Sequence, residues 1–416
     1  MQASHSFPAS PASGGFPTRP GGHQSVGVRD TDPRGASLPD APMGDARMGG
    51  TAPRGASLHD ASMRDARMGE TPPRGASLHD TSMRDTGPRD TGRHAHPPAG
   101  QHAPRGPNAG LLAGAGPEVR GSSEFTRRIS RDGSTGFLAE PARYHLYASL
   151  ACPWSQRALI VRRLLGLERV IGLTLTDPVP AEHGWRFAAE TGGRDPLTGA
   201  RFLSELYLAT DPGYAGRVSL PVLWDTRTQR IVTNDFAQLT VQLETEFGAY
   251  CRPGAPDLYP AAQRREIEAV ATLVHHTVNN GVYKAGLAAS QADYEVAFDA
   301  IFTTLDALEE RLARRRFLLG PQPTEADVRL FPTLARFDAV YYLLYKCNLH
   351  RLADYPSMWA YARDLYQQPG FGDTTDFVQI KLHYYQAHSW INPTRIVPKG
   401  PYVSWLEPHG RERMPG

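Results

Sequence analysis

The sequence predicts an α/β domain followed by an all-helical domain, with a long N-terminal tail in front of both. Residues 1–115 hold 18 Gly and 15 Pro but only nine Leu, Val, Ile or Phe. Strand-like and helix-like patterns alternate up to about residue 250, and only helical patterns follow. We therefore expect a disordered tail, an α/β domain, a helical domain and a C-terminal extension, at 1–120, 121–250, 255–376 and 377–416.

The tail lacks the residues that build a core. It contains no Tyr, Trp, Cys or Lys, whereas the remaining 301 residues carry all 17 Tyr and all six Trp. Such a segment cannot bury enough apolar surface to offset chain entropy, so we expect it to be disordered. The motif PRGASL recurs at 33–38, 53–58 and 73–78. Because each unit is rich in Gly and Pro and poor in apolar residues, low-complexity expansion explains the repeat better than a solenoid does.

Charge and cysteine content exclude several classes of protein. Beyond residue 115 the chain has 33 acidic and 33 basic side chains, a balance that argues against a nucleic-acid partner. Three cysteines do not make a disulfide framework in a chain of 416 residues. No apolar run reaches the length of about 18 residues that a membrane span needs, and no secretory signal pattern is present. We expect a cytoplasmic protein that does not enter a membrane.

A strand–helix–strand unit opens the α/β domain. Residues 143–149 alternate between apolar and polar side chains, as a half-buried strand does. Apolar residues then recur at helical spacing over 154–165, with Pro153 suited to the first turn and Gly166 to the end. Residues 170–176 read as a second strand, which completes a βαβ unit.

A hairpin and a helix complete this domain. An insertion, two hairpin strands and a helix are expected at 177–217, 220–225, 230–233 and 235–247. Asn234 or Asp235 would cap the helix. The order of elements is that of a thioredoxin-like domain, and Pro221 stands where that fold places a cis-proline.

Everything beyond a Pro/Gly linker at 253–256 reads as helix. The expected helices cover 260–280, 290–314, 324–345 and 356–367. Thr324 and Asp327 form a capping box before the third of these, so a structural role for Asp327 is more plausible than a catalytic one. The aromatic segment 377–406 is expected to pack back on the body.

Cys152 is the strongest candidate for chemistry. It follows a strand and precedes a helix, where unpaired N–H groups and the helix dipole favour a thiolate. Ser155 occupies the place of a second cysteine, so the site is monothiol and a second molecule's thiol must resolve a mixed disulfide. The alternative is a buried inert thiol, which is the role that we expect for Cys251 and Cys347.

A tyrosine at a predicted helix break is the second candidate. Tyr283 follows Asn280-Gly281, and a phenol at such a break can face a cleft and bind a substrate oxygen. The tyrosines between 341 and 345 lie at helical spacing, which is more typical of a core. Adjacent His275 and His276 lack further ligands at metal-site spacing, so we expect no metal.

Six segments together resemble the Xi-class glutathione transferases, the glutathionyl-hydroquinone reductases. They are SLACPWSQRALIVRRLLGLE, HGWRF, ELYLATDPGYAGRVSLPVLWD, NNGVYKAG, TEADVRLFPTLARFDAVYYLLYKCN and IKLHYYQAHSWINPTRIVPKGP. The resemblance covers about residues 120–406. It implies a thioredoxin-like domain plus an all-α glutathione-transferase domain, a homodimer, and thiol-dependent reduction of glutathionyl-hydroquinones.

The resemblance also implies roles for individual residues. The nucleophile falls on Cys152 and the two substrate-binding tyrosines fall on Tyr283 and Tyr384. The resemblance also implies three residues that contact the thiol co-substrate. Trp185 would stack on it, Arg217 would bind its glycine carboxylate, and Leu220, beside the cis-proline Pro221, would bind it through the backbone.

One pair of residues departs from the family. Asp235-Phe236 stands where the family has Glu-Ser, which grips the γ-glutamyl group of glutathione. Asp235 keeps the charge with a shorter reach, and Phe236 lacks the hydroxyl. We therefore hypothesise that either glutathione or another low-molecular-weight thiol, such as mycothiol, is the co-substrate.

Two other functions fit a monothiol cysteine or a transferase-like fold. The first is a general omega-like thioltransferase or dehydroascorbate reductase, which would have little need for the tyrosines. The second is a non-enzymatic binding module, which would have little need for a reactive Cys152.

Overall fold

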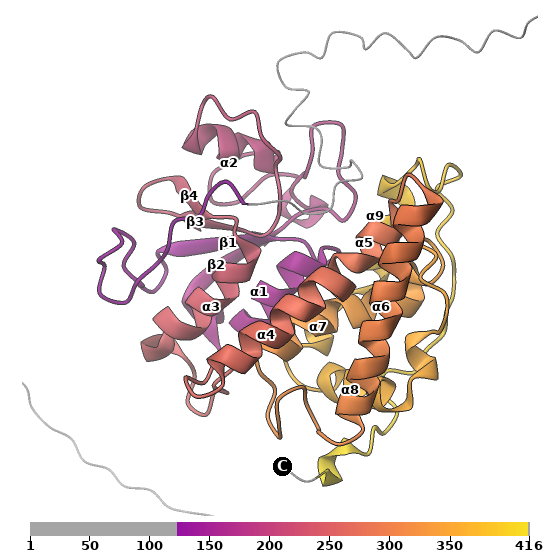
Figure 1. Cartoon of the computed structure of the whole chain (residues 1–416). Helices are drawn as coiled ribbons and strands as arrows, with labels where there is room; N and C mark the ends of the chain where they lie inside the picture. Colours follow the sequence, from indigo (N-terminus) through magenta and orange to yellow (C-terminus); the bar gives the residue numbers. More distant parts are fainter. Residues whose placement is uncertain (1–122, 415–416) are drawn as a thin grey trace, which may run out of the picture. The chain divides into compact units, whose positions relative to one another are not determined.

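The computed structural model describes residues 123–414, apart from the side chain of Glu190 (Figure 1). The predicted disorder and the repeats of residues 1–120 lie outside these described residues. The described part has the two predicted parts in sequence order, first a small mixed sheet and then a set of helices.

Four strands form one sheet in the order β2-β1-β3-β4. β1 (Tyr144–Ala148) pairs in parallel with β2 (Ile171–Leu175) and antiparallel with β3 (Val222–Asp225), which pairs antiparallel with β4 (Arg230–Thr233). All four strands fall within the predicted segments. The topology is that of a thioredoxin-like domain, as the sequence predicted.

Successive residues of β1 lie on opposite faces of the sheet. Leu146 and Ala148 belong to a buried cluster that includes α1, while Tyr147 between them belongs to a second cluster built around the insertion. Leu223 and Trp224 of β3 divide in the same way. The sheet therefore separates two cores.

The insertion contains a helix that the sequence pattern did not predict. α2 (Leu203–Thr210) packs against β4 and buries Leu203 and Leu206. A buried carboxylate ties the insertion to the sheet, because Asp195 accepts hydrogen bonds from Tyr147 Oη at 2.8 Å and Thr174 Oγ1 at 3.1 Å.

Six α-helices of the described part follow the linker. They are α4 (Arg264–Val274), α5 (Gly281–Gly286), α6 (Gln291–Leu312), α7 (Glu325–Arg336), α8 (Pro356–Tyr366) and α9 (Phe377–Ala387). The expected break at Asn280-Gly281 is instead a π-helical turn over His275–Asn279 that leads directly into α5. A second π-helical turn, Phe337–Tyr341, ends the helix expected over 324–345 early. The predicted capping box at Thr324 and Asp327 is present.

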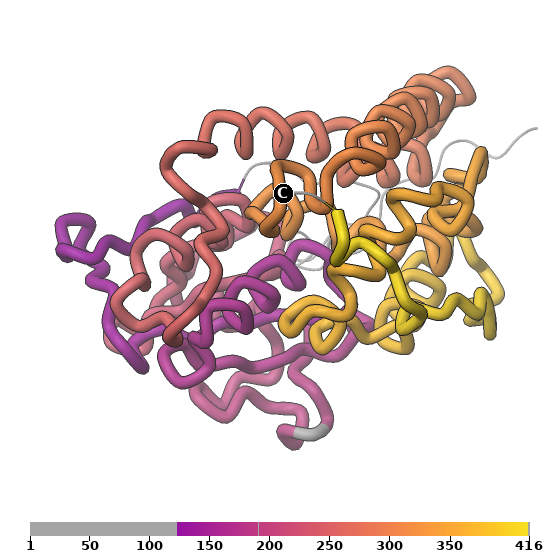
Figure 2. The backbone as a smooth tube through the Cα atoms, turned by 90° about the horizontal axis from the view of Figure 1, so that it is seen from below, coloured from indigo at the N-terminus to yellow at the C-terminus, as the bar shows by residue number. Residues whose placement is uncertain are grey.

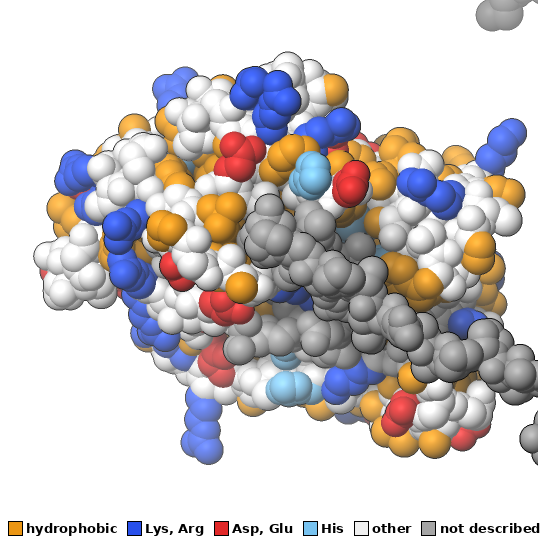
Figure 3. All heavy atoms as spheres, turned by 90° about the horizontal axis from the view of Figure 1, so that it is seen from above, with side chains coloured by type: hydrophobic (Ala, Val, Ile, Leu, Met, Phe, Trp, Pro, Cys, Tyr) orange, Lys and Arg blue, Asp and Glu red, His pale blue; other side chains and the backbone are white. Residues whose placement is uncertain are grey.

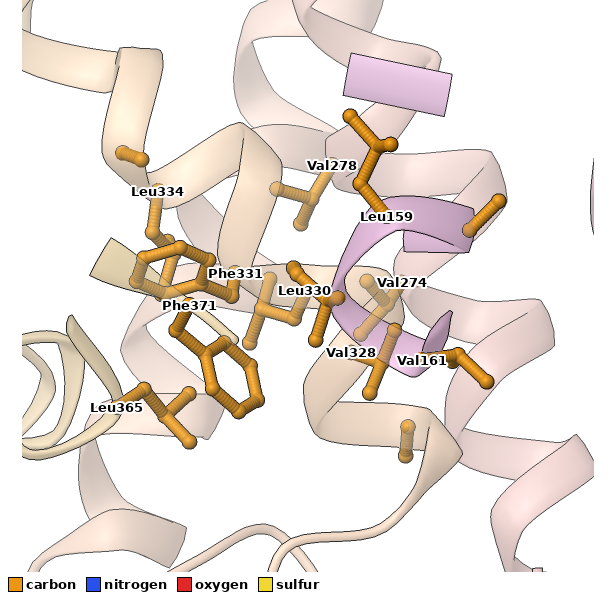
Figure 4. Close-up of a cluster of buried hydrophobic side chains, with 14 of the residues drawn as sticks. Leu159, Val161, Val274, Val278, Val328, Leu330, Phe331, Leu334, Leu365 and Phe371 are labelled. Atoms are coloured by element: carbon orange, nitrogen blue, oxygen red, sulfur yellow. The ribbon is translucent and has the colours of Figure 1, made fainter. Parts of the chain in front are cut away.

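α1 (Pro153–Leu164) joins the sheet to the helices. Both α3 (Phe236–Glu246) and α7 pack against it, so most of its residues are buried. In Figure 4, Leu159 of α1 lies in the same group of buried side chains as Val274 of α4 and Leu330 of α7. The start of α1 is thus fixed by packing against both α3 and α7.

The chain ends in a segment that crosses the helices (Figure 2). Trp405 is buried in this segment and packs against Trp359 and Tyr366 of α8 and Phe377 of α9. None of the helices between residues 123 and 414 combines the length and apolar character needed to cross a membrane.

Candidate active site

Cys152 lies at the N-cap of α1, immediately before Pro153. Its extended backbone (φ −83°, ψ 121°) lets its carbonyl accept the first helical hydrogen bond from Gln156 N at 3.0 Å. Cys152 Sγ lies 3.9 Å from the carbonyl oxygen of Leu220, the residue before the cis peptide bond to Pro221. The thiol therefore sits where the helix dipole favours an anion, and it contacts the predicted backbone clamp.

The thiol belongs to a buried cluster that is rich in aromatic rings. Cys152, Trp154, Trp185, Leu220 and Phe236 belong to the same buried cluster. The rings of Trp154 and Phe236 lie 4.6 Å apart, and Ser155 Oγ is fully buried without a hydrogen-bond partner in the described part of the chain. The Ser155 hydroxyl therefore makes no hydrogen bond with Cys152.

Trp185 stacks on a histidine that the sequence did not single out. The rings of Trp185 and His383 are 5.4 Å apart and 18° from parallel, and His383 Nδ1 lies 2.7 Å from the carbonyl oxygen of Pro178. Burial lowers the pKa of His383 to about 3, so its ring is neutral. The insertion and α9 are thus joined beside the site.

Three phenol groups meet within hydrogen-bond distance. Tyr283 Oη lies 2.5 Å from Tyr384 Oη, which lies 2.9 Å from Tyr341 Oη. The two predicted tyrosines are therefore brought together, and Tyr341, which the spacing assigned to the core, joins them. Tyr345 packs against all three rings.

Burial governs the protonation of these phenols. It raises the pKa of Tyr283, and the hydrogen bond from Tyr384 opposes that shift. The nearby Cys152 thiol raises the pKa of Tyr283 further. Burial raises the pKa of Tyr384 well above its usual value. All these phenols are hydrogen-bond donors at neutral pH.

The remaining predicted residues occupy different parts of the site. Asp235 caps α3, where its Oδ1 accepts hydrogen bonds from Ala237 N at 3.2 Å and Gln238 N at 3.3 Å. Arg217 is partly exposed, and its carbonyl accepts a hydrogen bond from Tyr214 Oη at 2.7 Å. The Asp235 carboxylate is thus partly used by its own helix.

The other two cysteines lie in different surroundings. Burial raises the pKa of the Cys347 thiol to about 12 and also raises that of Cys251. Between residues 123 and 414, no three His, Cys, Asp or Glu side chains gather as metal ligands would. On the face shown in Figure 3, basic side chains lie at several separate places with acidic ones between them.

Known proteins share most of the described chain. A family model for the glutathione S-transferase C-terminal domain matches residues 288–364. The chain is 44% identical to the glutathionyl-hydroquinone reductase YqjG of Escherichia coli K12 over 301 residues, which cover 70% of this chain and 92% of the relative. It is 46% identical to the glutathionyl-hydroquinone reductase PcpF of Sphingobium chlorophenolicum over 270 residues, which cover 64% and 85% of the two chains. A solved structure of YqjG with glutathione bound matches with a TM-score of 0.67 at 44% identity, over 70% of this chain and 96% of that one.

Proposed function

Because the chain belongs to the glutathionyl-hydroquinone reductases, the Xi class of glutathione transferases, we propose that it reduces S-conjugated hydroquinones through a mixed disulfide at Cys152. Glutathione is the thiol co-substrate, in line with the relative whose structure holds it. The substrate would be a glutathionyl-hydroquinone and the product a free hydroquinone.

One observation carries the assignment of roles. Tyr283 packs against the buried cluster that contains Cys152 and also against the cluster that contains Tyr341 and Tyr384. A conjugate whose sulfur reaches Cys152 would therefore have its ring beside the phenols. A simple disulfide reductase has no use for such a group of donors, so this arrangement favours a phenolic substrate over the thioltransferase alternative.

In the first step, the Cys152 thiolate attacks the glutathione sulfur of the conjugate in its keto tautomer. A sulfur–sulfur bond forms as the carbon–sulfur bond breaks, and the released electron pair makes the ring an aromatic phenolate. Tyr283 and Tyr384 would hold this oxygen and assist its protonation. The products are hydroquinone and a Cys152–glutathione disulfide.

In the second step, the thiolate of another glutathione attacks the glutathione sulfur of the mixed disulfide. Glutathione disulfide leaves and the Cys152 thiolate is restored. Trp185, Arg217 and the backbone of Leu220 are the groups that would hold the thiol in both steps. The helix dipole of α1 stabilises the leaving thiolate.

The departure at Asp235-Phe236 calls for a comparison of glutathione with a second thiol, mycothiol. Asp235 caps its own helix and Phe236 packs on Trp154, and these two residues stand where the family has Glu-Ser. Turnover of one conjugate with glutathione and with mycothiol would compare them. Saturable use of glutathione at low concentration would contradict the mycothiol hypothesis.

We further propose a homodimer that works in the cytoplasm. Exposed apolar side chains near the C-terminus, such as Val378 and Ile396, support an association surface. Sedimentation of the full chain would test the dimer.

Replacing Cys152 tests the mechanism. Cys152→Ala should abolish reduction of a glutathionyl-hydroquinone because no mixed disulfide can form. Cys251→Ser is the control, and it should keep near-wild-type turnover. Thermal melts would show that both variants are folded. If Cys152→Ala keeps most of the activity, the proposed chemistry is wrong.

A further inference from the structure

Arg336, the last residue of α7, is fully buried beside the turn that presents Cys152. Its guanidinium donates to the carbonyl oxygens of Leu150 at 3.1 Å and of Ala151 at 3.1 and 3.2 Å. It also donates to Gln156 Oε1 at 2.5 Å, on the first turn of α1, and to Pro332 O at 2.8 Å. Arg336, which lies in the helical part, thus binds residues that precede and follow Cys152 in the chain.

All these acceptors are uncharged. Across residues 123–414, no carboxylate forms an ion pair with Arg336, whereas the buried guanidiniums of Arg143 and Arg329 are paired with Asp225 and Glu325. An arginine keeps its positive charge in a protein, and a buried charge without a counter-ion is costly. The fold therefore holds a positive charge here for which the described chain offers no carboxylate partner.

The charge of Arg336 acts on the substrate side of the site. It lowers the pKa of Tyr283, Tyr341 and Tyr384, against the larger opposite effect of burial, and adds to the lowering of the pKa of His383. These groups lie on three different elements, so the field covers the region where the conjugate would bind. Cys152 follows Ala151 directly, and is next to the carbonyl that the guanidinium holds.

We propose that Arg336 is a positioning residue that fixes the turn before Cys152 and supplies the buried positive charge that balances the Cys152 thiolate. The proposal rests on the proposed function in taking Cys152 as the nucleophile. The thiolate is the missing counter-ion, and the same charge favours the phenolate that forms when the ring leaves.

Two substitutions separate the charge from the clamp. Arg336→Lys keeps a positive charge but cannot donate as a planar fork to two neighbouring carbonyls. Arg336→Gln removes the charge and keeps a shorter donor. Loss of a neighbouring opposite charge moves a titration by roughly one to three pH units, so the two variants should differ clearly.

The test is the pH dependence of Cys152 alkylation by iodoacetamide in the full-length protein, followed by mass spectrometry of the Cys152 peptide. In Arg336→Gln we expect the midpoint to rise by roughly one pH unit or more. In Arg336→Lys we expect a smaller rise than in Arg336→Gln. Because no hydroquinone is used, the outcome is independent of whether the conjugate is the substrate.

Arg411 provides the matched control. It is also buried and donates to the main-chain carbonyls of Leu312, Arg316 and Ser357, in the C-terminal part of the chain. Arg411→Gln should lower the melting temperature and leave the alkylation midpoint of Cys152 unchanged. An unchanged midpoint in folded Arg336→Gln would overturn the proposal. If that variant does not fold, a midpoint in Arg336→Lys raised by a full unit or more would overturn the role of the charge.

Discussion

The phenol of Tyr283 contacts buried tyrosines on one side and the buried cluster that contains Cys152 on the other. Tyr384 and Tyr341 are buried, and their hydroxyls form a short chain that ends at Tyr283. If Tyr341 donates to Tyr384 and Tyr384 to Tyr283, the hydrogen of Tyr283 is directed to the substrate. Burial raises the pKa of Tyr283, so it stays a donor through the neutral range.

Removing this donor should slow only the reaction that makes a phenolate. We expect Tyr283→Phe to lower kcat for a glutathionyl-hydroquinone by about 10²- to 10³-fold, the usual effect of losing one oxyanion donor. Reduction of a small mixed disulfide should change only a few-fold, because its leaving group is a thiolate. Steady-state kinetics with both substrates would measure the difference.

Tyr345 is the control for this prediction. Its ring packs in the same group of tyrosines, but its hydroxyl is buried and has no hydrogen-bond partner in the described part of the chain. Tyr345→Phe removes an unsatisfied polar group, so activity should persist and stability should not fall. Equal losses in the two variants would mean that the phenol of Tyr283 has no special role.

Local patterns predicted Cys152 but not the residues that support it. A cysteine between a strand and a helix is visible in the sequence, because the N-terminus of a helix follows from its neighbours. His383 and Arg336 reach the site from α9 and α7, which lie far away in the chain. Only tertiary packing brings them there, so no spacing rule could identify them.

At the scale of elements, strands and amphipathic helices were predictable and irregular turns were not. The strand at 143–149 was predicted from alternation, and the other three were predicted as short apolar segments, which fits a sheet covered on both faces. α2 is short and lies in an insertion rich in loop residues, which hid it. The π-helical turns at His275–Asn279 and Phe337–Tyr341 keep helical hydrogen bonding. Each shifts the helical spacing of the apolar residues only slightly, so neither could be recognised from that spacing.

A pair of carboxyl groups joins α3 to α7. Both oxygens of Glu244 and Oε2 of Glu325 are buried without hydrogen-bond partners in residues 123–414, while Glu325 Oε1 accepts from Thr240 and Arg329. Burial and the charge of Glu325 raise the pKa of Glu244 well above its usual value, Asp257 adds to this, and Arg329 opposes it. A proton on Glu244 can then bridge the two side chains.

This pair should make stability depend on pH. A folded-state pKa above the unfolded value means that the stabilisation is complete in acid and is lost as the pH rises through the folded pKa. Glu244→Gln keeps a donor without a titrating group, so we expect the variant to be more stable than wild type at pH 8, by on the order of 1 kcal/mol. Thermal melts from pH 5 to pH 9 would measure the slope.

Glu246 on the same helix is the control. It is partly exposed and accepts a hydrogen bond from Arg131 N at 3.0 Å. Glu246→Gln should leave the slope unchanged. A wild-type slope that persists in Glu244→Gln would show that Glu244 does not share its proton in this way.

At the scale of the whole molecule, the site forms where two buried clusters meet. Cys152 and Tyr384 belong to different buried clusters, and Tyr283 contacts both. The sequence predicted both halves from composition and order of elements. Only the resemblance to a family indicated that the two halves form one site. The domain boundaries at 121–250 and 255–376 stay predictions.

The C-terminal segment should stabilise the substrate side of the site through Trp405. This ring lies 5.5 Å from that of Phe377, at the start of the helix that carries Tyr384, and 4.8 Å from that of Trp359. We expect Trp405→Ala to cost about 3 to 5 kcal/mol, as a large buried ring does, and to lower the melting temperature by roughly 10 °C.

The same variant should lose hydroquinone reduction before it loses thiol chemistry. Loosening α9 displaces Tyr384 and the His383–Trp185 stack, whereas Cys152 is held by α1 and Arg336. We expect kcat for the conjugate to fall while the rate of Cys152 alkylation at pH 7 is kept, both measured below the melting temperature. Trp390→Ala is the control for stability, because that ring is 46% exposed and its loss should change the melting temperature far less. Equal melting temperatures for the two variants would mean that the C-terminal segment does not hold α9 in place.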